Sequence, residues 1–396
     1  MTATRHYLLA AGGTGGHMLP AYALAGELIS RGHRVALVSD DRGLKIPGAP
    51  AELETHVLPA GRVHGGPIGW VKAALAIRKG RRMGIDLIDE FDPAVVVGFG
   101  GYPSLPSLLA AKATKRPTVI HEQNAVLGRT NRLMAGRVDA IAVAYRNIHR
   151  FPEALALKRH LTGNPVREEV IAIREEGYPP FPEDGIMRLL VVGGSLGATV
   201  LSDVVPAAIA MLPRALLDRL QIVQQARESD IEGVRAKYAE LGVAAECAPY
   251  FADIPDRMRW AHLVIARAGA STVAELACAG RPAVFVPYPH AMDDHQSWNV
   301  ADLVEAGGAV SFAQPDFTAA ALAKQIQRMA LEPGALEEAA ARAASCGLPD
   351  ATRDLADLVE SLAAPPMMDV IRVGASARSA AVAGGIAATR TRSGGE

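Results

Sequence analysis

Short apolar runs alternate along the chain with longer segments in which apolar residues recur at helical spacing. The first run, residues 6–11, ends at a glycine-rich turn, residues 12–16, and a helical segment follows at residues 21–30. The same pattern predicts further buried strands at residues 35–38, 93–98, 117–121 and 140–143. Strands that alternate with helices in this way are typical of a parallel sheet with right-handed crossovers.

The same order of elements begins again near residue 188. Strand 188–192 leads into a second glycine-rich turn, residues 193–198, and later strands are predicted at residues 221–223, 263–266 and 283–286. We therefore expect an α/β protein with two Rossmann-like domains, residues 1–162 and 163–349, joined near Gly163. A last amphipathic helix is predicted within residues 350–362. Residues 363–396 are rich in Ala, Gly, Ser and Arg, which predicts a disordered tail.

Composition narrows the functional classes. Lys and Arg total 41 and Asp and Glu total 42, which excludes binding of nucleic acid through bulk positive charge. Three cysteines far apart in the chain form neither a disulfide framework nor a metal-ligand pair. No secretory signal is evident and no apolar run is long enough to span a bilayer, so we expect a cytoplasmic protein.

The two glycine-rich turns predict a phosphorylated ligand. A helix N-terminus carries unpaired N–H groups and partial positive charge, and glycine lets a phosphate approach the backbone closely. A dinucleotide fingerprint would need glycine where the chain has Met18, and the chain contains no Gly-Lys pair for a P-loop. An NAD enzyme and a P-loop NTPase are therefore disfavoured, whereas two purely structural βα turns remain an alternative.

Seven motifs occur in an order and at a spacing that resemble the MurG family of GT-B glycosyltransferases, over roughly residues 7–362. They are Gly12-Gly13-Thr14-Gly15-Gly16-His17, Gly100-Gly101-Tyr102, His121-Glu122-Gln123-Asn124, Gly163-Asn164-Pro165-Val166-Arg167, Gly193-Gly194-Ser195-Leu196-Gly197-Ala198, the run from Arg267 to Glu275, and the run from Asp294 to Asn299. The resemblance implies a GT-B fold, in which two parallel sheets face each other across a cleft and the last helix returns to the first domain.

The resemblance also implies the reaction. N-acetylglucosamine would pass from UDP-N-acetylglucosamine to lipid I, the undecaprenyl-diphosphate-linked N-acetylmuramyl pentapeptide, to give lipid II for peptidoglycan. Such enzymes invert the anomeric carbon and use neither a metal nor another cofactor. Negative charge that builds on the leaving diphosphate would then be met by backbone N–H groups, a helix dipole and a cation.

The resemblance assigns a set of residues to the donor: Thr14, Gly15, Gly16, Asn124, Arg167, Ser195, Ala270, Ser271, Thr272, Glu275 and Gln296. Arg167 suits the diphosphate because a guanidinium matches phosphate geometry, although it also fits an ordinary surface arginine. Glu275 would bind the ribose hydroxyls, but Thr272-Val273-Ala274-Glu275 also has the pattern of a capping box.

His17, Tyr102 and Glu122 are expected on the acceptor side of the cleft. A histidine with an ordinary pKa of about 6.5 can take a proton from the acceptor hydroxyl near neutral pH, so His17 is a candidate general base. It could equally bind the acceptor diphosphate, and a structural histidine is the remaining alternative. His290, Asp293 and His295 are metal ligands by type, but their spacing is not a standard zinc pattern, and no metal is expected.

The segment from Trp70 to Arg82 is a candidate contact with the membrane that holds the acceptor. Trp70, Ala74 and Ile77 are predicted to lie on one helical stripe, and the cations are Lys72, Arg78, Lys79, Arg81 and Arg82. This pattern suits peripheral binding to the cytoplasmic face of the inner membrane, but it suits an ordinary helix with a solvated basic end as well.

Two other functional classes stay open at this point. One is a nucleotide-sugar enzyme with different chemistry, such as a UDP-N-acetylglucosamine 2-epimerase, which shares the GT-B architecture. The other is a nucleotide-sugar-binding or scaffold protein without turnover, with partners in cell-wall synthesis or cell division.

Overall fold

A computed structural model describes residues 4–60, 66–182, 184–194 and 197–363. Its first sheet, in the order β3-β2-β1-β4-β5-β6-β7, contains β1 (His6–Ala10), β2 (Arg34–Ser39), β3 (Glu54–Val57), β4 (Val95–Gly98), β5 (Thr118–Glu122), β6 (Ala140–Val143) and β7 (Arg159–Leu161). Its second sheet, in the order β10-β9-β8-β11-β12-β13, contains β8 (Met187–Val192), β9 (Leu220–Gln225), β10 (Ala244–Ala248), β11 (Leu263–Ala266), β12 (Ala283–Phe285) and β13 (Ala309–Ser311).

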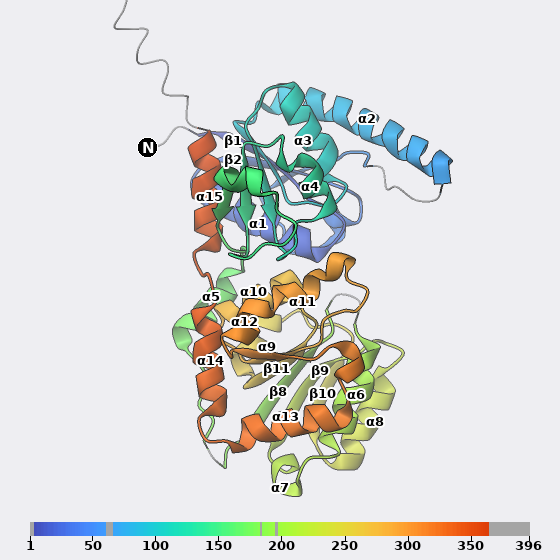
Figure 1. The fold of residues 1–396 in the computed structure, drawn as a ribbon, viewed down its shortest axis with the longest axis vertical. Coiled ribbons are helices and arrows are strands. Elements are labelled where there is room, and N and C mark those ends of the chain that lie inside the picture. Colours follow the sequence, from blue (N-terminus) through green and yellow to red (C-terminus); the bar gives the residue numbers. More distant parts are fainter. Residues whose placement is uncertain (1–3, 61–65, 183, 195–196, 364–396) are drawn as a thin grey trace, which may run out of the picture.

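Helices cover both sheets, and the two domains lie one above the other (Figure 1). The N-terminal domain carries α1 (Gly15–Ser30), α2 (Gly66–Phe91), α3 (Ser104–Ala113) and α4 (Arg129–Ala135). The remaining helices are α5 (Glu168–Glu176), α6 (Thr199–Ile209), α7 (Arg214–Leu217), α8 (Ile231–Leu241), α9 (Ile254–Trp260), α10 (Ala270–Cys278), α11 (His295–Asn299), α12 (Ala301–Glu305), α13 (Ala319–Leu331), α14 (Ala335–Ser345) and α15 (Ala351–Leu362). Short 3₁₀ turns lie at Gly43–Lys45, Glu153–Lys158, Met292–Asp294 and Gln314–Asp316.

The central strands are rich in apolar residues because both faces of each sheet are buried. In β1, Tyr7 and Leu9 pack into one cluster with α1 and α15, whereas Leu8 and Ala10 pack into another with α2 and α3. All strand pairs in both sheets are parallel, as the alternation of strands and helices predicts.

The predicted central strands are confirmed, whereas β3, β7, β10 and β13 were missed. These four strands are the sheet edges, and they are either partly exposed or, like β13, only three residues long, so they lack the apolar runs that mark β1 or β8. Helix α1 begins at Gly15, within the predicted glycine-rich turn, rather than at residue 21. The apolar spacing alone gave too late a start because Gly15 and Gly16 carry no side chain to contribute to it.

Helix α15 returns to the N-terminal domain, where it packs along α1 (Figure 1). Leu355, Ala356 and Val359 on its inner face join the cluster formed by α1, β1 and β4. The last helix therefore ties the chain end to the first domain after the chain has passed through the second.

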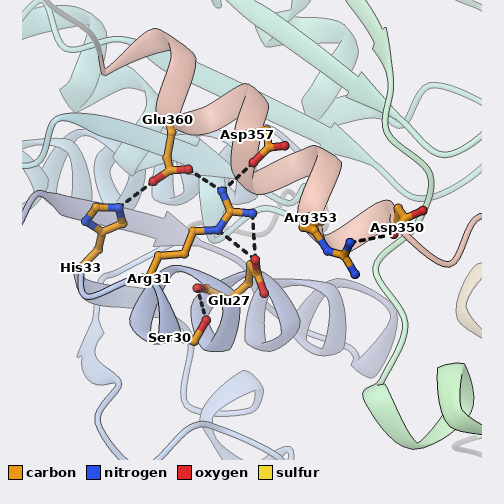
Figure 2. Close-up of polar contacts among 8 residues, drawn as sticks. All are labelled: Glu27, Ser30, Arg31, His33, Asp350, Arg353, Asp357 and Glu360. Carbon is orange, nitrogen blue, oxygen red and sulfur yellow. Dashed lines mark hydrogen bonds and ion pairs between the residues drawn. The ribbon is translucent and has the colours of Figure 1, made fainter. Parts of the chain in front are cut away.

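An ion-pair network fixes α15 beside the end of α1 (Figure 2). Arg31 binds Glu27 of α1 at 2.8 Å and Asp357 of α15 at 2.6 Å, and it also binds Glu360. His33 Nδ1 accepts a hydrogen bond from the Arg5 N–H, so its Nε2 carries the proton that it donates to Glu360 at 2.7 Å. These contacts hold polar groups from three segments together at the edge of the apolar interface.

Acid is expected to weaken this network. Burial opposes the charge of Glu360, but hydrogen bonds from His33 and Arg31 outweigh it and lower the pKa of Glu360 below 4.5. The contribution of Glu360 is therefore present above pH 4.5 and is lost as the pH falls through the lowered folded pKa. Glu360→Gln should lower Tm by about 2–4 °C at pH 7, and this difference should shrink at pH 3.

The matched control is Glu338→Gln, which removes one partner of an exposed pair with Arg342. It should leave Tm nearly unchanged at both pH values. A Tm difference for Glu360→Gln that is equal at pH 7 and pH 3 would contradict the assignment.

Helix α2 presents an apolar face to solvent that differs from the predicted stripe. Trp70, Val71 and Leu75 are exposed, whereas Ile77 packs against the core beside α3 and α4. Of the predicted stripe, Trp70 and Ala74 are exposed, but Ile77 is half-buried and is not available for a membrane contact, because that side of the helix covers its own sheet. The cations Lys72, Arg78, Lys79, Arg81 and Arg82 are all exposed.

Candidate functional site

A cleft of about 620 Å³ lies between the domains at the carboxyl ends of both sheets. Its N-terminal wall is the start of α1, where Thr14, Gly15 and Gly16 lie. Its C-terminal wall consists of the second glycine turn, the start of α10 and the segment that follows β12. Crevices at this edge of parallel sheets are the usual ligand sites of doubly wound folds.

Most of the predicted donor residues come together in this cleft. They are Thr14, Gly15, Gly16, Ala270, Ser271, Thr272 and Gln296. Gln296 accepts a hydrogen bond from the Tyr288 N–H through its Oε1 at 2.9 Å, which leaves its NH₂ group for another acceptor. Ser195 and Leu196 lie outside the described residues.

The second glycine turn needs its glycines for close packing. A Cβ on Gly193 would lie 2.7 Å from the Ala198 nitrogen, and one on Gly197 would lie 2.7 Å from Arg227 Cγ. Gly194 and Gly197 have φ values of 79° and 65°, which side chains rarely adopt. The turn delivers the chain into α6, whose first N–H groups receive no side-chain cap. This arrangement suits a phosphate group at the helix N-terminus.

Arg227 is a cleft residue that the sequence reasoning missed. It follows β9, the strand beside β8, and its guanidinium reaches the Gly197 carbonyl at 3.5 Å. Because β9 adjoins the strand that enters the glycine turn, the residues just after β9 must lie beside that turn. An arginine at that position in the sequence was the available signal.

Arg267 also lines the cleft, but its guanidinium is hydrogen-bonded to other groups of the protein. It donates to the carbonyls of Val286 and Pro287 at 3.0 and 3.1 Å and to Gln314 Oε1 at 2.7 Å. Burial lowers the pKa of Arg267 from its ordinary value. Arg267 therefore fixes the segment after β12 that carries Tyr288 and Gln296.

Arg167 and Glu275 bind each other beside the cleft rather than lining it. Arg167 Nη2 lies 2.9 Å and Nε 3.0 Å from Glu275 Oε1. Burial raises the pKa of Glu275, and the Arg167 charge opposes this rise. The capping-box interpretation of Glu275 is wrong, because α10 begins at Ala270 after Gly269, which places Thr272 and Glu275 inside the helix.

A second cavity of about 190 Å³ brings the predicted acceptor residues together. His17, Tyr102, Glu122 and Asn124 line it from the N-terminal domain, so Asn124 lies with the acceptor residues rather than in the larger cleft. Met292, Asp293 and His295 close it from the other domain. His17 directly follows Gly16 of the cleft wall, so it connects the two spaces along the chain.

Glu122 organises the loop around this cavity. Its carboxylate accepts hydrogen bonds from the N–H groups of Asn124 and Gly128 at 3.1 and 2.7 Å, and from the side chains of Asn124 and Asn131 at 3.2 and 2.8 Å. These four hydrogen bonds use both carboxylate oxygens, so Glu122 fixes the loop on the predicted acceptor side.

Contacts between the domains fix the far wall of this cavity. Asp293 forms ion pairs of 2.9 Å with both Arg132 and Arg150, and Asn299 accepts a hydrogen bond from the Ala125 N–H at 2.8 Å. The negative charge of Asp293 is thus compensated by two arginines. Within the described ranges no group of three His, Cys, Asp or Glu side chains is arranged to hold a metal ion.

Comparisons with known proteins cover nearly the whole chain. The glycosyltransferase family 28 N-terminal domain matches residues 7–143 and the family 28 C-terminal domain matches residues 188–356. A protein of Sphingopyxis alaskensis is 82% identical over 390 residues, which are 98% of this chain and 99% of the relative. The chain belongs to glycosyltransferase family 28, as a member of the MurG group.

The names of the family 28 relatives agree with each other. The Sphingopyxis protein and a relative from Novosphingobium aromaticivorans, 56% identical over 96% of this chain and 98% of its own, are both named UDP-N-acetylglucosamine–N-acetylmuramyl-(pentapeptide) pyrophosphoryl-undecaprenol N-acetylglucosamine transferase. The resemblance drawn from the seven motifs is confirmed.

Solved structures confirm the predicted GT-B fold of this family 28 protein. The crystal structure of MurG from Acinetobacter baumannii matches 90% of this chain and 99% of its own, with a TM-score of 0.73 and 30% identity. A UDP-GlcNAc 2-epimerase from Neisseria meningitidis matches 89% of this chain and 98% of its own, with a TM-score of 0.60 and 13% identity. At that identity the epimerase shares the fold alone.

Proposed function

We infer that this protein transfers N-acetylglucosamine from UDP-N-acetylglucosamine to lipid I and so forms lipid II for peptidoglycan. The observation that carries this conclusion is the full-length relative at 82% identity, whose name states this transfer. The cleft lining is compatible with a nucleotide sugar, because it combines a glycine turn suited to phosphate with polar side chains suited to a sugar.

Within this reaction the C-terminal domain binds the donor. The diphosphate would lie at the turn before α6, where N–H groups and the helix dipole meet its charge and Arg227 supplies a nearby cation. Gln296 would bind the donor sugar, and Ala270, Ser271 and Thr272 would line the nucleotide site. Glu275 and Arg167 would support this wall as a pair and reach the ribose and the diphosphate only if their ion pair rearranges.

The N-terminal domain presents the acceptor. The C4 hydroxyl of the N-acetylmuramyl residue attacks C1 of the donor sugar from the face opposite the leaving UDP, which inverts that carbon. The transition state resembles an oxocarbenium ion, and its leaving diphosphate gains negative charge. His17 takes the hydroxyl proton, while Tyr102 and Asn124 shape the space in which the acceptor lies.

An assay of the purified protein with UDP-N-acetylglucosamine and a lipid I analogue tests this proposal. Free UDP should be released only when the lipid I analogue is present, and the sugar should be found in the lipid product. Conversion of UDP-N-acetylglucosamine into its 2-epimer without acceptor would instead support the epimerase, and donor binding without turnover would support a scaffold.

EDTA should leave kcat unchanged in the same assay. We expect this because main-chain N–H groups and guanidinium groups meet the diphosphate charge that a divalent ion would otherwise meet. Loss of turnover in EDTA that returns on adding Mg²⁺ would refute the metal-independent part of the proposal.

The exposed face of α2 is the proposed contact with the cytoplasmic face of the membrane. No helix in the described segments is long and apolar enough to cross a bilayer. Trp70 and Leu75 are 65% and 62% exposed and point away from the protein core, with Lys72 on the same helix. Helix α2 lies at the periphery of the N-terminal domain, which leaves this face accessible (Figure 1).

Charge reversal on α2 should weaken membrane binding. Each cation near an anionic surface contributes about 1 kcal/mol, so Arg81→Glu with Arg82→Glu should lower partitioning onto anionic vesicles by about 30-fold or more. Sedimentation with vesicles of phosphatidylglycerol measures this.

The control for this variant changes the net charge equally in the other domain, through Lys237→Glu with Arg328→Glu on exposed faces of α8 and α13. It should sediment like the unaltered protein. Equal losses in the two variants would mean that total charge, and not α2, sets the binding.

A further inference from the structure

A chain of hydrogen bonds connects His17 to the backbone between the two domains. His17 Nδ1 lies 3.0 Å from Gln123 Oε1, and Gln123 Nε2 lies 3.0 Å from His121 Nδ1. His121 Nε2 lies 2.9 Å from the carbonyl oxygen of Gly163. His121 and Gln123 are 0% and 1% exposed, so water does not compete for these bonds.

The donor and the acceptor of each hydrogen bond can be assigned by starting at the Gly163 carbonyl. A carbonyl oxygen only accepts, so His121 Nε2 must carry the proton that it shares with Gly163. Burial lowers the pKa of His121 to about 4, which keeps the ring neutral near pH 7. A neutral ring with a proton on Nε2 has a lone pair on Nδ1, and this atom accepts from Gln123.

The amide of Gln123 can be placed in only one way. Its Nε2 faces two acceptors, His121 Nδ1 and the His121 carbonyl oxygen at 3.2 Å. Reversing the amide would place its oxygen, an acceptor, next to both of these acceptors, and neither hydrogen bond could form. Gln123 Oε1 therefore faces His17, and because that oxygen only accepts, His17 Nδ1 must donate.

We propose that Gln123 and His121 are positioning residues that hold neutral His17 as its Nδ1–H tautomer, so that Nε2 keeps the lone pair that takes the acceptor proton. Free histidine favours the opposite tautomer, with the proton on Nε2. The inference rests on the proposed function for the use of this lone pair, whereas the tautomer itself follows from the hydrogen bonds alone.

A neutral amide is suited to this task. A carboxylate at the same place would also fix the tautomer, but its charge would stabilise the protonated ring. The amide orients the ring through a hydrogen bond and places no charge beside it.

The ring of His17 is also confined by glycines. A Cβ on Gly100 would lie 3.4 Å from His17 Cε1, and one on Gly101 would lie 3.0 Å from the Gly12 oxygen and 3.4 Å from His17 Cδ2. Gly163, the last member of this series of hydrogen bonds, is also closely packed, because a Cβ on it would lie 2.8 Å from Ala351 Cβ at the start of α15.

The first test reads the tautomer directly. Nitrogen-15 NMR of the ligand-free enzyme with labelled histidine should show a protonated Nδ1 and an unprotonated Nε2 on His17, assigned by comparison with His17→Ala. A proton on His17 Nε2 would overturn the proposal. Because no substrate is present, this result is independent of the transferase assay, which alone decides the proposed function.

The second test removes the amide. Gln123→Leu should move the His17 proton to Nε2 and lower kcat by about 10- to 100-fold, with KM for UDP-N-acetylglucosamine nearly unchanged. His121→Phe, whose ring can pack on Phe99 as the imidazole does, should shift the tautomer in the same direction if Gln123→Leu does not fold. An unshifted tautomer in either folded variant, or an unchanged kcat, would refute the relay.

Gln224→Leu is the matched control. Gln224 is also fully buried, and it accepts from the Tyr238 hydroxyl and donates to the Leu201 carbonyl in the other domain. Its replacement removes a buried amide of the same size and should lower stability. The His17 tautomer should not change, and kcat should stay within about twofold.

Discussion

Replacing His17 with alanine is expected to lower kcat by about 100-fold or more, while KM for UDP-N-acetylglucosamine changes little. The imidazole lies in the cavity lined by the predicted acceptor residues, and in the proposed mechanism it acts on the acceptor hydroxyl in the transition state rather than on the bound donor. Steady-state rates with a lipid I analogue, measured at saturating donor, give the comparison.

His17→Asn separates the two roles that the sequence leaves open. The asparagine amide nitrogen lies close to the position of Nδ1, so it can still donate to Gln123 Oε1, but it cannot take a proton. If His17 is the base, kcat falls as far as in the alanine variant. If His17 binds the acceptor diphosphate instead, KM for the lipid rises and kcat is largely kept.

His160→Ala is the control, because His160 lies on the exposed strand β7 away from both cavities. It should behave as the unaltered enzyme does. A normal kcat for purified, folded His17→Ala would end the assignment of the base.

Replacing Arg281 with leucine is expected to destabilise the C-terminal domain by about 3–5 kcal/mol. Arg281 is 1% exposed, and burial lowers its pKa to about 10, so it is a buried cation at neutral pH. Its guanidinium donates to the carbonyls of Met258, Ala279 and Gly177 at 2.8, 2.9 and 3.2 Å. Leucine would leave these carbonyls buried without their donor.

Thermal unfolding followed by calorimetry measures this effect, and Tm should fall by about 10 °C. The control is Arg342→Leu on α14, which removes an exposed arginine from its pair with Glu338 and should cost less than about 1 kcal/mol. If the two variants unfold at the same temperature, the carbonyls around Arg281 do not depend on its guanidinium.

Several features of the site could be predicted from short stretches of sequence. The first glycine turn, the second glycine turn and the start of α10 each combine a buried strand, small residues and a helix, and all three line the cleft. Gln296 was also placed in the cleft, from the family resemblance. Each of these features depends on a few adjacent residues, so the local sequence is enough to predict it.

The pairing of side chains could not be predicted in the same way. Arg167 and Glu275 are 108 positions apart, and only the packing of α5 against α10 brings them together. Predicting that Arg227 lies in the cleft requires the strand order. Predicting the role of Gln123 requires knowing that the backbone at Gly163 lies beside His121. The exposed face of α2 likewise depended on which side of the helix covers the sheet.

The sequence by itself determined the two-domain α/β architecture, the two glycine-rich turns and the family, because periodicity, glycine positions and motif order are local properties of the chain. Only the tertiary structure decided which cation lies beside the second glycine turn, which carboxylates are already hydrogen-bonded, and how the proton of His17 is placed. Those properties depend on contacts between segments far apart in the chain, and such contacts exist only once both sheets and α15 have packed.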